Sequence, residues 1–271
     1  MGANEAWSLS EKGNRRVAVV TGASKGIGRE ISIQLASAGF HIAVNYFGDE
    51  RGAMETAERV AGYGVRSIVV RADVGMKSDV DQMFDYVLEK LGTPDALVNN
   101  AGVQTWKPLL DLKEEEWDRT LRTNLKGTFL CTQRAAKHMA ARGQGHIVNI
   151  GSGCNKVPFP NLVDYTSSKG GVEMFTRVSA VELGPHGINV NCVAPGTIEI
   201  ERTKTESTDY ASTWRPHIPV GRIGQPSDVA AAVAFLLSAQ ASFISGQTIY
   251  VDGACFSQGP WPYPVQKTKL P

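Results

Sequence analysis

Short apolar runs alternate with longer amphipathic stretches along most of this chain. Seven runs are short and rich in β-branched residues, as strands buried on both faces should be. They are Val17–Val20, His41–Val44, Arg66–Val70, Ala96–Val98, His146–Ile150, Asn189–Val193 and Thr248–Val251. The helix-length stretches between them include Gly28–Ala38, Ala53–Ala61, Asp79–Lys90, Glu115–Ala141, Ser167–Leu183 and Ser227–Leu237. This alternation predicts an α/β fold, in which a parallel sheet of about seven strands carries helices on both faces.

The alternation continues without a Pro/Ser-rich linker, so we expect one domain over residues 16–258. We expect residues 1–15 to form a flexible leader and the Pro-rich residues 259–271 to form a tail. The polar segment Glu199–Pro219 fits neither the strand period nor the helix period. Long non-periodic segments are often functional loops, so this one is a candidate lid.

Composition excludes several classes of function. The 28 Lys and Arg residues balance 27 Asp and Glu residues, so no broad attraction to nucleic acid or to an anionic membrane is expected. Four cysteines occur without a CxxC or Cys/His cluster, which argues against a zinc site and a disulfide framework. The polar N-terminus does not look like a signal peptide, and no apolar run approaches a membrane span. We therefore expect a cytoplasmic protein that binds neither metal nor membrane.

A glycine-rich loop, Thr21-Gly22-Ala23-Ser24-Lys25-Gly26-Ile27-Gly28, joins the first predicted strand to the first predicted helix. Glycines allow a tight turn and a close approach of the backbone to a pyrophosphate, and the helix N-terminus offers N–H groups and a positive dipole end. A plain connecting turn would also contain glycines. The strand before and the helix after favour a nucleotide site.

Further motifs follow the loop in a fixed order. They are Asp73-Val74, Asn99-Asn100-Ala101-Gly102, Asn124, Ser152, Tyr165 with Lys169, and Pro195-Gly196. Together with the TGxxxGxG spacing of the loop, this set resembles the short-chain dehydrogenase/reductase family over roughly residues 16–253. Members that share further features with this chain include glucose 1-dehydrogenase-like enzymes and 3-oxoacyl-carrier-protein reductases. The resemblance implies a doubly wound Rossmann fold and an NAD(P)-dependent oxidoreductase that assembles as a homotetramer.

Proton transfer suggests roles for Tyr165 and Lys169. Hydride transfer to a carbonyl leaves an alkoxide that needs a proton, and a free tyrosine, with a pKa near ~10, is a weak base. On a helix, Lys169 lies on the same face as Tyr165, and its ammonium can lower that pKa. A surface Tyr–Lys pair has the same spacing. The resemblance implies that Tyr165 is the acid/base, that Ser152 donates a hydrogen bond to the substrate oxygen, and that Asn124 helps to hold a water that relays protons to Lys169.

The loop and the resemblance together imply a set of cofactor-binding residues. These are Gly22, Ser24, Lys25, Gly26, Ile27, Gly28, Asn45, Tyr46, Asp73, Val74, Asn100, Ala101, Gly102, Tyr165, Lys169, Pro195, Gly196 and Ile198. No carboxylate stands at the end of the second predicted strand, although Asp49 lies a little beyond it, and Lys25 adds a cation. We therefore favour NADP(H) over NAD(H). If Lys25 instead points to solvent, NAD(H) would serve nearly as well.

The sequence does not name the substrate, because the predicted lid, about residues 197–220, has mixed charge. Ile200 stands where the family often has a threonine that contacts the nicotinamide carboxamide; Thr197 or Thr203 could substitute. We predict hydride transfer between NADP(H) and a small ketone or secondary alcohol. The alternatives are an NAD-preferring sugar dehydrogenase and a dinucleotide-binding regulator without turnover. A regulator has no need for the complete set of catalytic residues.

Overall fold

The computed structural model describes residues 16–206 and 209–259. Its seven strands form one sheet in the order β3-β2-β1-β4-β5-β6-β7, and every neighbouring pair is parallel. The strands are β1 (Val17–Val20), β2 (His41–Tyr46), β3 (Ser67–Arg71), β4 (Ala96–Asn99), β5 (Gly145–Ile150), β6 (Ile188–Pro195) and β7 (Thr248–Val251). The predicted doubly wound α/β fold is confirmed. The expected leader, and the tail beyond residue 259, lie outside the described residues.

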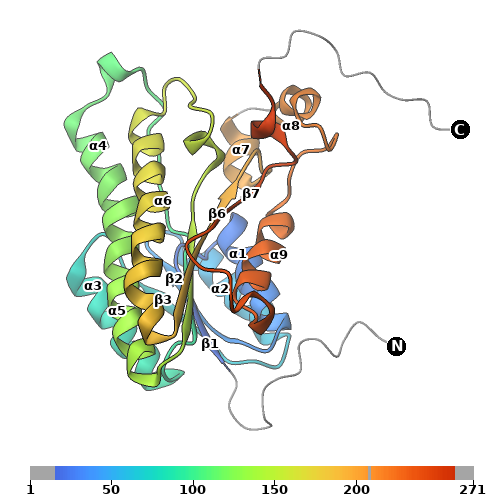
Figure 1. The fold of residues 1–271 in the computed structure, drawn as a ribbon. Coiled ribbons are helices and arrows are strands. Elements are labelled where there is room, and N and C mark those ends of the chain that lie inside the picture. The colour runs from blue at the N-terminus through green and yellow to red at the C-terminus, as the bar shows by residue number, and fades with distance from the viewer. Residues whose placement is uncertain (1–15, 207–208, 260–271) are drawn as a thin grey trace, which may run out of the picture.

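Helices cover both faces of the sheet, as Figure 1 shows. They are α1 (Gly26–Ser37), α2 (Glu50–Ala61), α3 (Lys77–Lys90), α4 (Glu114–Leu121), α5 (Gly127–Arg142), α6 (Val163–Leu183), α7 (Glu201–Glu206), α8 (Tyr210–Trp214) and α9 (Pro226–Leu236). Side chains alternate between the faces along each strand. Val20 therefore packs in the core beneath α1, α2 and α9, while Val19 packs in the core beneath α3 and α5. None of the described helices is long and apolar enough to cross a membrane.

The helix predicted over Glu115–Ala141 is present as one continuous run from α4 through α5, and a π-helical turn, Arg122–Lys126, lies within it. The Asn124 side chain in this segment accepts a hydrogen bond from Val103 N at 2.8 Å and donates one to Val103 O at 2.9 Å. The wider π turn thus coincides with a side chain bonded to a distant loop. Such insertions in helices are frequent at functional sites.

The polar segment predicted as a non-periodic lid contains α7, α8 and a 3₁₀ turn at Arg215–His217. Trp214 packs edge-on against Phe159 at 5.7 Å between ring centroids, and Phe159 packs against Phe256 at 5.6 Å. These aromatic contacts join the lid to the loop after β5 and to the turn after β7. Both helices are too short to show a helical period in the sequence.

Candidate active site

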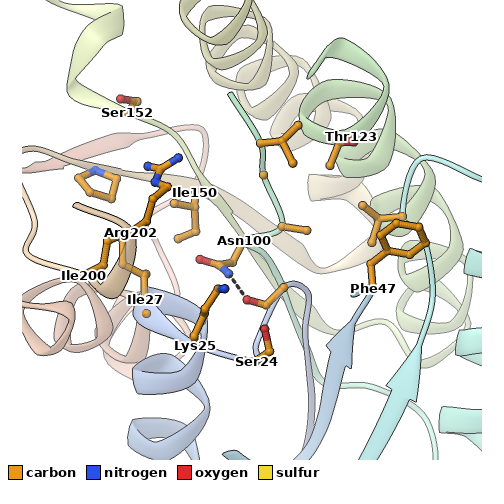
Figure 2. Close-up of a pocket in the computed structure, with 18 of the residues that line it drawn as sticks. Ser24, Lys25, Ile27, Phe47, Asn100, Thr123, Ile150, Ser152, Ile200 and Arg202 are labelled. Carbon is orange, nitrogen blue, oxygen red and sulfur yellow. Dashed lines mark hydrogen bonds between the residues drawn. The ribbon is translucent and has the colours of Figure 1, made fainter. Parts of the chain in front are cut away.

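A cavity of about 680 Å³ lies at the carboxyl ends of the central strands. The strand order reverses at β1, which has β2 on one side and β4 on the other. The loops that follow β1 and β4 diverge there, and open α/β sheets bind ligands in the resulting crevice. The glycine loop forms one wall of the cavity and the lid another. Figure 2 shows side chains from both walls converging on this space.

The glycine loop is shaped for close backbone contact. Gly22 has a left-handed backbone, with φ of 62°, and a Cβ there would lie 2.8 Å from Ala101 Cα. A Cβ on Gly28 would lie 2.5 Å from Asn100 Nδ2, which donates hydrogen bonds to Thr21 O and Gly22 O, each at 2.9 Å. The side chain of the N-cap residue, Lys25, makes no capping hydrogen bond to α1. The loop therefore presents backbone N–H groups and the positive end of a helix to an anion such as a pyrophosphate.

Of the two cofactor residues predicted at the end of β2, Asn45 lines the cavity and Tyr46 does not. Asn45 lines the cavity, but its side chain accepts from Gly22 N at 3.2 Å and donates to Ala72 O at 3.2 Å. Its amide therefore braces the glycine loop. Tyr46 is absent from the cavity wall and packs in the core beneath α1 and α2.

Phe47 and Asp49 line this end of the cavity, and the sequence analysis did not select them. Its predicted strand stopped at Val44, whereas β2 continues to Tyr46, so the following loop begins two residues later. Lys25 Nζ lies 3.7 Å from Asp49 Oδ2. The cation predicted to favour a 2′-phosphate thus has a carboxylate beside it. Asp73 also lines the cavity, and it pairs with Arg122 at 3.4 Å.

Tyr165 and Lys169 lie one helical turn apart at the start of α6, and both line the cavity. Lys169 is only 4% exposed; its Nζ donates to Ile150 O at 2.6 Å and lies 5.6 Å from the centroid of the Tyr165 ring. Burial lowers the pKa of Lys169 to about 8. Burial also raises the pKa of Tyr165 to about 12, opposed by a hydrogen bond with Ser152 and by the charge of Arg202. Tyr165 is therefore protonated at neutral pH.

Ser152 follows β5 and accepts two hydrogen bonds from Cys154, one from its N at 3.3 Å and one from its Sγ at 2.9 Å. Because the Ser152 oxygen accepts both of these bonds, the hydroxyl can donate its own proton to another acceptor, such as Tyr165 or a substrate. Gly151 precedes it, and a Cβ there would lie 2.6 Å from Cys192 Sγ. The cysteine sulfur fills the space that a serine at position 151 would need.

Asn124 lies behind the cavity wall, across the loop after β4. A Cβ on Gly102 would lie 3.4 Å from Asn124 Oδ1 and 3.7 Å from Lys169 Nζ, so these two atoms flank the same glycine. Asn124 Nδ2 also donates to Ser168 Oγ at 2.9 Å. Its side chain is 1% exposed. The structure thus brings the four predicted catalytic residues together, with Asn124 set one layer deeper than the other three.

Asp164 positions the helix that carries Tyr165 and Lys169, a role that the sequence analysis missed. This carboxylate is buried; its Oδ1 accepts from Tyr165 N at 2.7 Å, and its Oδ2 accepts from Thr120 Oγ1 at 2.7 Å. It thereby ties the first turn of α6 to α4. The sequence carries a weak signal for this role, because an acidic residue in the first turn of a helix stabilises that turn.

The remaining predicted cofactor residues line the cavity. They are Ser24, Gly26, Ile27, Val74, Ala101, Pro195, Gly196 and Ile198. Of the residues considered for the carboxamide contact, Ile200 and Thr203 line the cavity, whereas Thr197 does not. Thr203 Oγ1 accepts from Ile200 N and donates to Ile200 O, both at 2.9 Å, so it is engaged in shaping the lid.

Comparison with known proteins places the chain in a family. Residues 22–254 match the family model described as enoyl-(acyl carrier protein) reductase. A 3-oxoacyl-[acyl-carrier-protein] reductase of Staphylococcus aureus is 41% identical over 88% of this chain and 97% of its own. A short-chain dehydrogenase/reductase of Armillaria gallica is 40% identical over 88% and 95%. The chain belongs to the short-chain dehydrogenase/reductase family.

Solved structures of short-chain dehydrogenases/reductases share the fold. A gluconate 5-dehydrogenase from Burkholderia cenocepacia, solved with NADP and tartrate, is 34% identical with a TM-score of 0.84 over 91% of this chain and 97% of its own. An acetoin dehydrogenase from Salmonella typhimurium is 35% identical with a TM-score of 0.82 over 91% and 99%. As a member of this family, the protein is an oxidoreductase, and the family binds NAD(P). Within the described residues, no cluster of His, Cys, Asp and Glu could hold a metal ion.

Proposed function

We propose that this enzyme transfers a hydride between NADP(H) and a ketone or secondary alcohol of a small molecule, with Tyr165 as acid and base. The observation that carries the proposal is the convergence of Ser152, Tyr165 and Lys169 on the cavity whose opposite wall is the glycine loop. The glycines and the start of α1 fit a dinucleotide, because Gly22 and Gly28 keep the loop backbone close to its neighbours and the N–H groups of the helix start face the cavity. When bound, the nicotinamide supplies or accepts the hydride.

The side chains of this enzyme then have separate tasks. In the reducing direction, the Ser152 hydroxyl donates a hydrogen bond to the substrate oxygen, and Tyr165 gives that oxygen a proton. Burial keeps Tyr165 protonated at neutral pH, which is the state a donor needs. The Lys169 ammonium lies beside the ring and stabilises the phenolate as the proton leaves. Asn124 and Lys169 flank Gly102, where a water could return a proton to Tyr165 by way of Lys169.

NADP(H) is the proposed cofactor, and Lys25 is the main support. On this proposal its ammonium, 3.7 Å from Asp49, turns toward a 2′-phosphate when the dinucleotide is bound. The related gluconate 5-dehydrogenase was solved with NADP, which agrees with this choice. Replacing Lys25 with glutamine should lower kcat/KM for NADPH much more than for NADH. An unchanged ratio of the two would contradict the proposed role of Lys25.

The second candidate, an NAD-preferring dehydrogenase, is favoured by a specific observation, the carboxylate of Asp49 in the cavity wall. A carboxylate here could accept hydrogen bonds from the adenosine ribose and repel a 2′-phosphate. Replacing Asp49 with serine distinguishes the candidates. A wild-type enzyme that prefers NADH, and that changes to NADPH when Asp49 is replaced, would support the second candidate and contradict the first.

We further propose that the enzyme is a cytoplasmic homotetramer. Phe129 on α5 and Met174, Val178 and Val181 on α6 are between 41% and 77% exposed, which leaves apolar side chains for another subunit to cover. All four cysteines are free thiols, in keeping with a reducing compartment. A monomer in light scattering would contradict the tetramer.

The activity is tested by supplying NADPH or NADH with a panel of small ketones, oxo acids and keto sugars, and by following the cofactor absorbance. We expect at least one ketone to be reduced at a rate that scales with enzyme concentration. Failure of every carbonyl with NADPH and NADH, and of every matching alcohol with NADP⁺ and NAD⁺, by a protein that binds the cofactor, would favour the regulator without turnover.

A further inference from the structure

We infer that Arg202 binds an anionic group of the substrate, so that the preferred substrates of this enzyme are oxo acids and the corresponding hydroxy acids. The inference rests on the proposed function, because it concerns the substrate of the same site. Arg202 lies in the first turn of α7, directly after the loop that leaves β6. It lines the same cavity as Ser152 and Tyr165.

The position of the Arg202 side chain is the first support. Figure 2 shows it reaching from the lid into the cavity, with its guanidinium directed toward Ser152. Burial raises the pKa of Tyr165, and the positive charge of Arg202 opposes that rise; burial lowers the pKa of Lys169, and the charge of Arg202 adds to that fall. The guanidinium therefore acts on the atoms where proton transfer is proposed. A substrate whose carbonyl meets Ser152 and Tyr165 would extend toward Arg202.

The distribution of charge around the cavity is the second support. Lys25 lies beside Asp49, Arg122 lies beside Asp73, and both of these pairs lie at the part of the cavity assigned to the cofactor. Arg202 is carried by α7 and lines the cavity together with Ser152 and Tyr165. The cations near the cofactor residues and the cation near Ser152 and Tyr165 therefore come from different elements.

The residue before Arg202 in the lid is an acid, Glu201, and the position of its carboxylate bears on how a substrate would be oriented. The Glu201 Oε2 atom would lie 3.6 Å from a Cβ on Gly26, so this carboxylate lies over the glycine loop. Neighbouring residues of α7 thus present an acid near the loop and a base near the catalytic hydroxyls. An anionic group on the substrate would be attracted to Arg202 and repelled from the side of Glu201, which gives the substrate a direction in the cavity.

The chemistry of arginine narrows the ligand class. A guanidinium has only donors, keeps its charge at all physiological pH values, and matches a carboxylate with two parallel hydrogen bonds. An uncharged ketone offers a guanidinium no acceptor of comparable strength. A carboxylate offers two oxygens in the matching geometry. Oxo acids reduced to hydroxy acids are therefore the substrates that this lid fits best.

The test compares each oxo acid with its own methyl ester, across a series in which the ketone lies progressively farther from the carboxylate. Wild-type enzyme, Arg202→Met and Arg202→Lys are assayed with NADPH. Arg215→Met is the matched control, because Arg215 is an exposed lid arginine that does not line the cavity. Binding without turnover is measured by calorimetry, by adding the hydroxy acid to enzyme saturated with NADPH, a pair that cannot react.

We expect wild-type enzyme to prefer the acid to its ester. Arg202→Met should lower kcat/KM for the acid by roughly 10- to 100-fold, as expected for a hydrogen bond to a charged group, and should change the ester by only a few-fold. Arg202→Lys should recover part of the loss, and Arg215→Met should behave as wild type. The affinity for NADPH should be unchanged in all variants, and the hydroxy acid should bind wild type but not Arg202→Met.

Three results would overturn the inference. They are equal losses for acid and ester in Arg202→Met, weaker NADPH binding in that variant, which would assign Arg202 to the cofactor, and a wild-type enzyme that reduces only neutral ketones. In the last case the proposed function would stand. If wild-type enzyme reduced nothing, the proposed function would fail, whereas the loss of hydroxy-acid binding in Arg202→Met would still support the role of Arg202.

Discussion

Lys169 is an amine held inside the protein with a backbone carbonyl as its hydrogen-bond acceptor, and this arrangement has a measurable cost. Burial lowers the pKa of Lys169 from 10.5 to about 8. Each pKa unit corresponds to about 1.36 kcal/mol, so an ammonium at this position destabilises the fold by roughly 3 kcal/mol at neutral pH. Replacing Lys169 with methionine, which has a similar length but no charge, should remove that cost. Loss of the hydrogen bond to Ile150 O opposes the gain by about 1 kcal/mol.

The expected net result is a Lys169→Met protein that is inactive and about 2 kcal/mol more stable than wild type near neutral pH. The sign of the pH dependence follows from the depressed pKa. The cost is complete below the folded-state pKa of about 8, where both states are protonated. It disappears as pH rises toward the unfolded value of 10.5, where both states are neutral. Near pH ~9.5, the pKa-linked cost should fall to less than half of its value at neutral pH.

Urea unfolding at a fixed protein concentration measures this difference. Lys137→Met is a suitable control, because Lys137 is exposed on α5 and its replacement should change stability by less than about 0.5 kcal/mol. A Lys169→Met protein that is less stable than wild type, or a stability difference that does not vary with pH, would refute the reasoning.

Two further predictions concern glycines that the structure requires. Gly28→Ala should weaken NADPH binding by tenfold or more, because a Cβ there would lie 2.5 Å from Asn100 Nδ2. The control is Gly170→Ala on α6, which should not change NADPH binding because nothing lies within 4 Å of its Cβ. Fluorescence titration with NADPH measures the dissociation constant of both variants. Gly151→Ser should lower thermal stability by displacing Cys192 Sγ, and Cys192→Ala should restore much of that loss when the two are combined; additive losses in the double variant would contradict the contact.

The strands were predictable because burial on both faces restricts them to short apolar runs, and all seven were located within two residues at each end. β2 and β6 each continue two residues beyond the predicted end, and the last residues of β2, Asn45 and Tyr46, look polar or amphipathic in sequence but are buried. That difference moved the loop by two residues, so Phe47 and Asp49 were not selected as cavity residues. The strand end was placed too early because Asn45 and Tyr46, which look like the end of a strand in the sequence, are buried by the tertiary structure.

The π turn inside the long helix could not be predicted from its own residues. It coincides with hydrogen bonds between Asn124 and Val103, which are 21 residues apart in sequence. The motif residues of the candidate site were found because their chemistry and order are distinctive. Arg202, in contrast, was one of several charged lid residues in the sequence, and only its place in the cavity beside Tyr165 selects it.

The central claim is that Tyr165 gives a proton to the substrate oxygen while NADP(H) exchanges the hydride. It is tested most directly by comparing wild-type enzyme with Tyr165→Phe, using the best ketone of the panel. Turnover and the dissociation constant for NADPH are measured on the same preparations. We predict that turnover falls by roughly 10²- to 10⁴-fold, the usual contribution of general acid catalysis, while NADPH binding changes by only a few-fold. A Tyr165→Phe enzyme that reduces the ketone at a rate close to wild type would contradict the account.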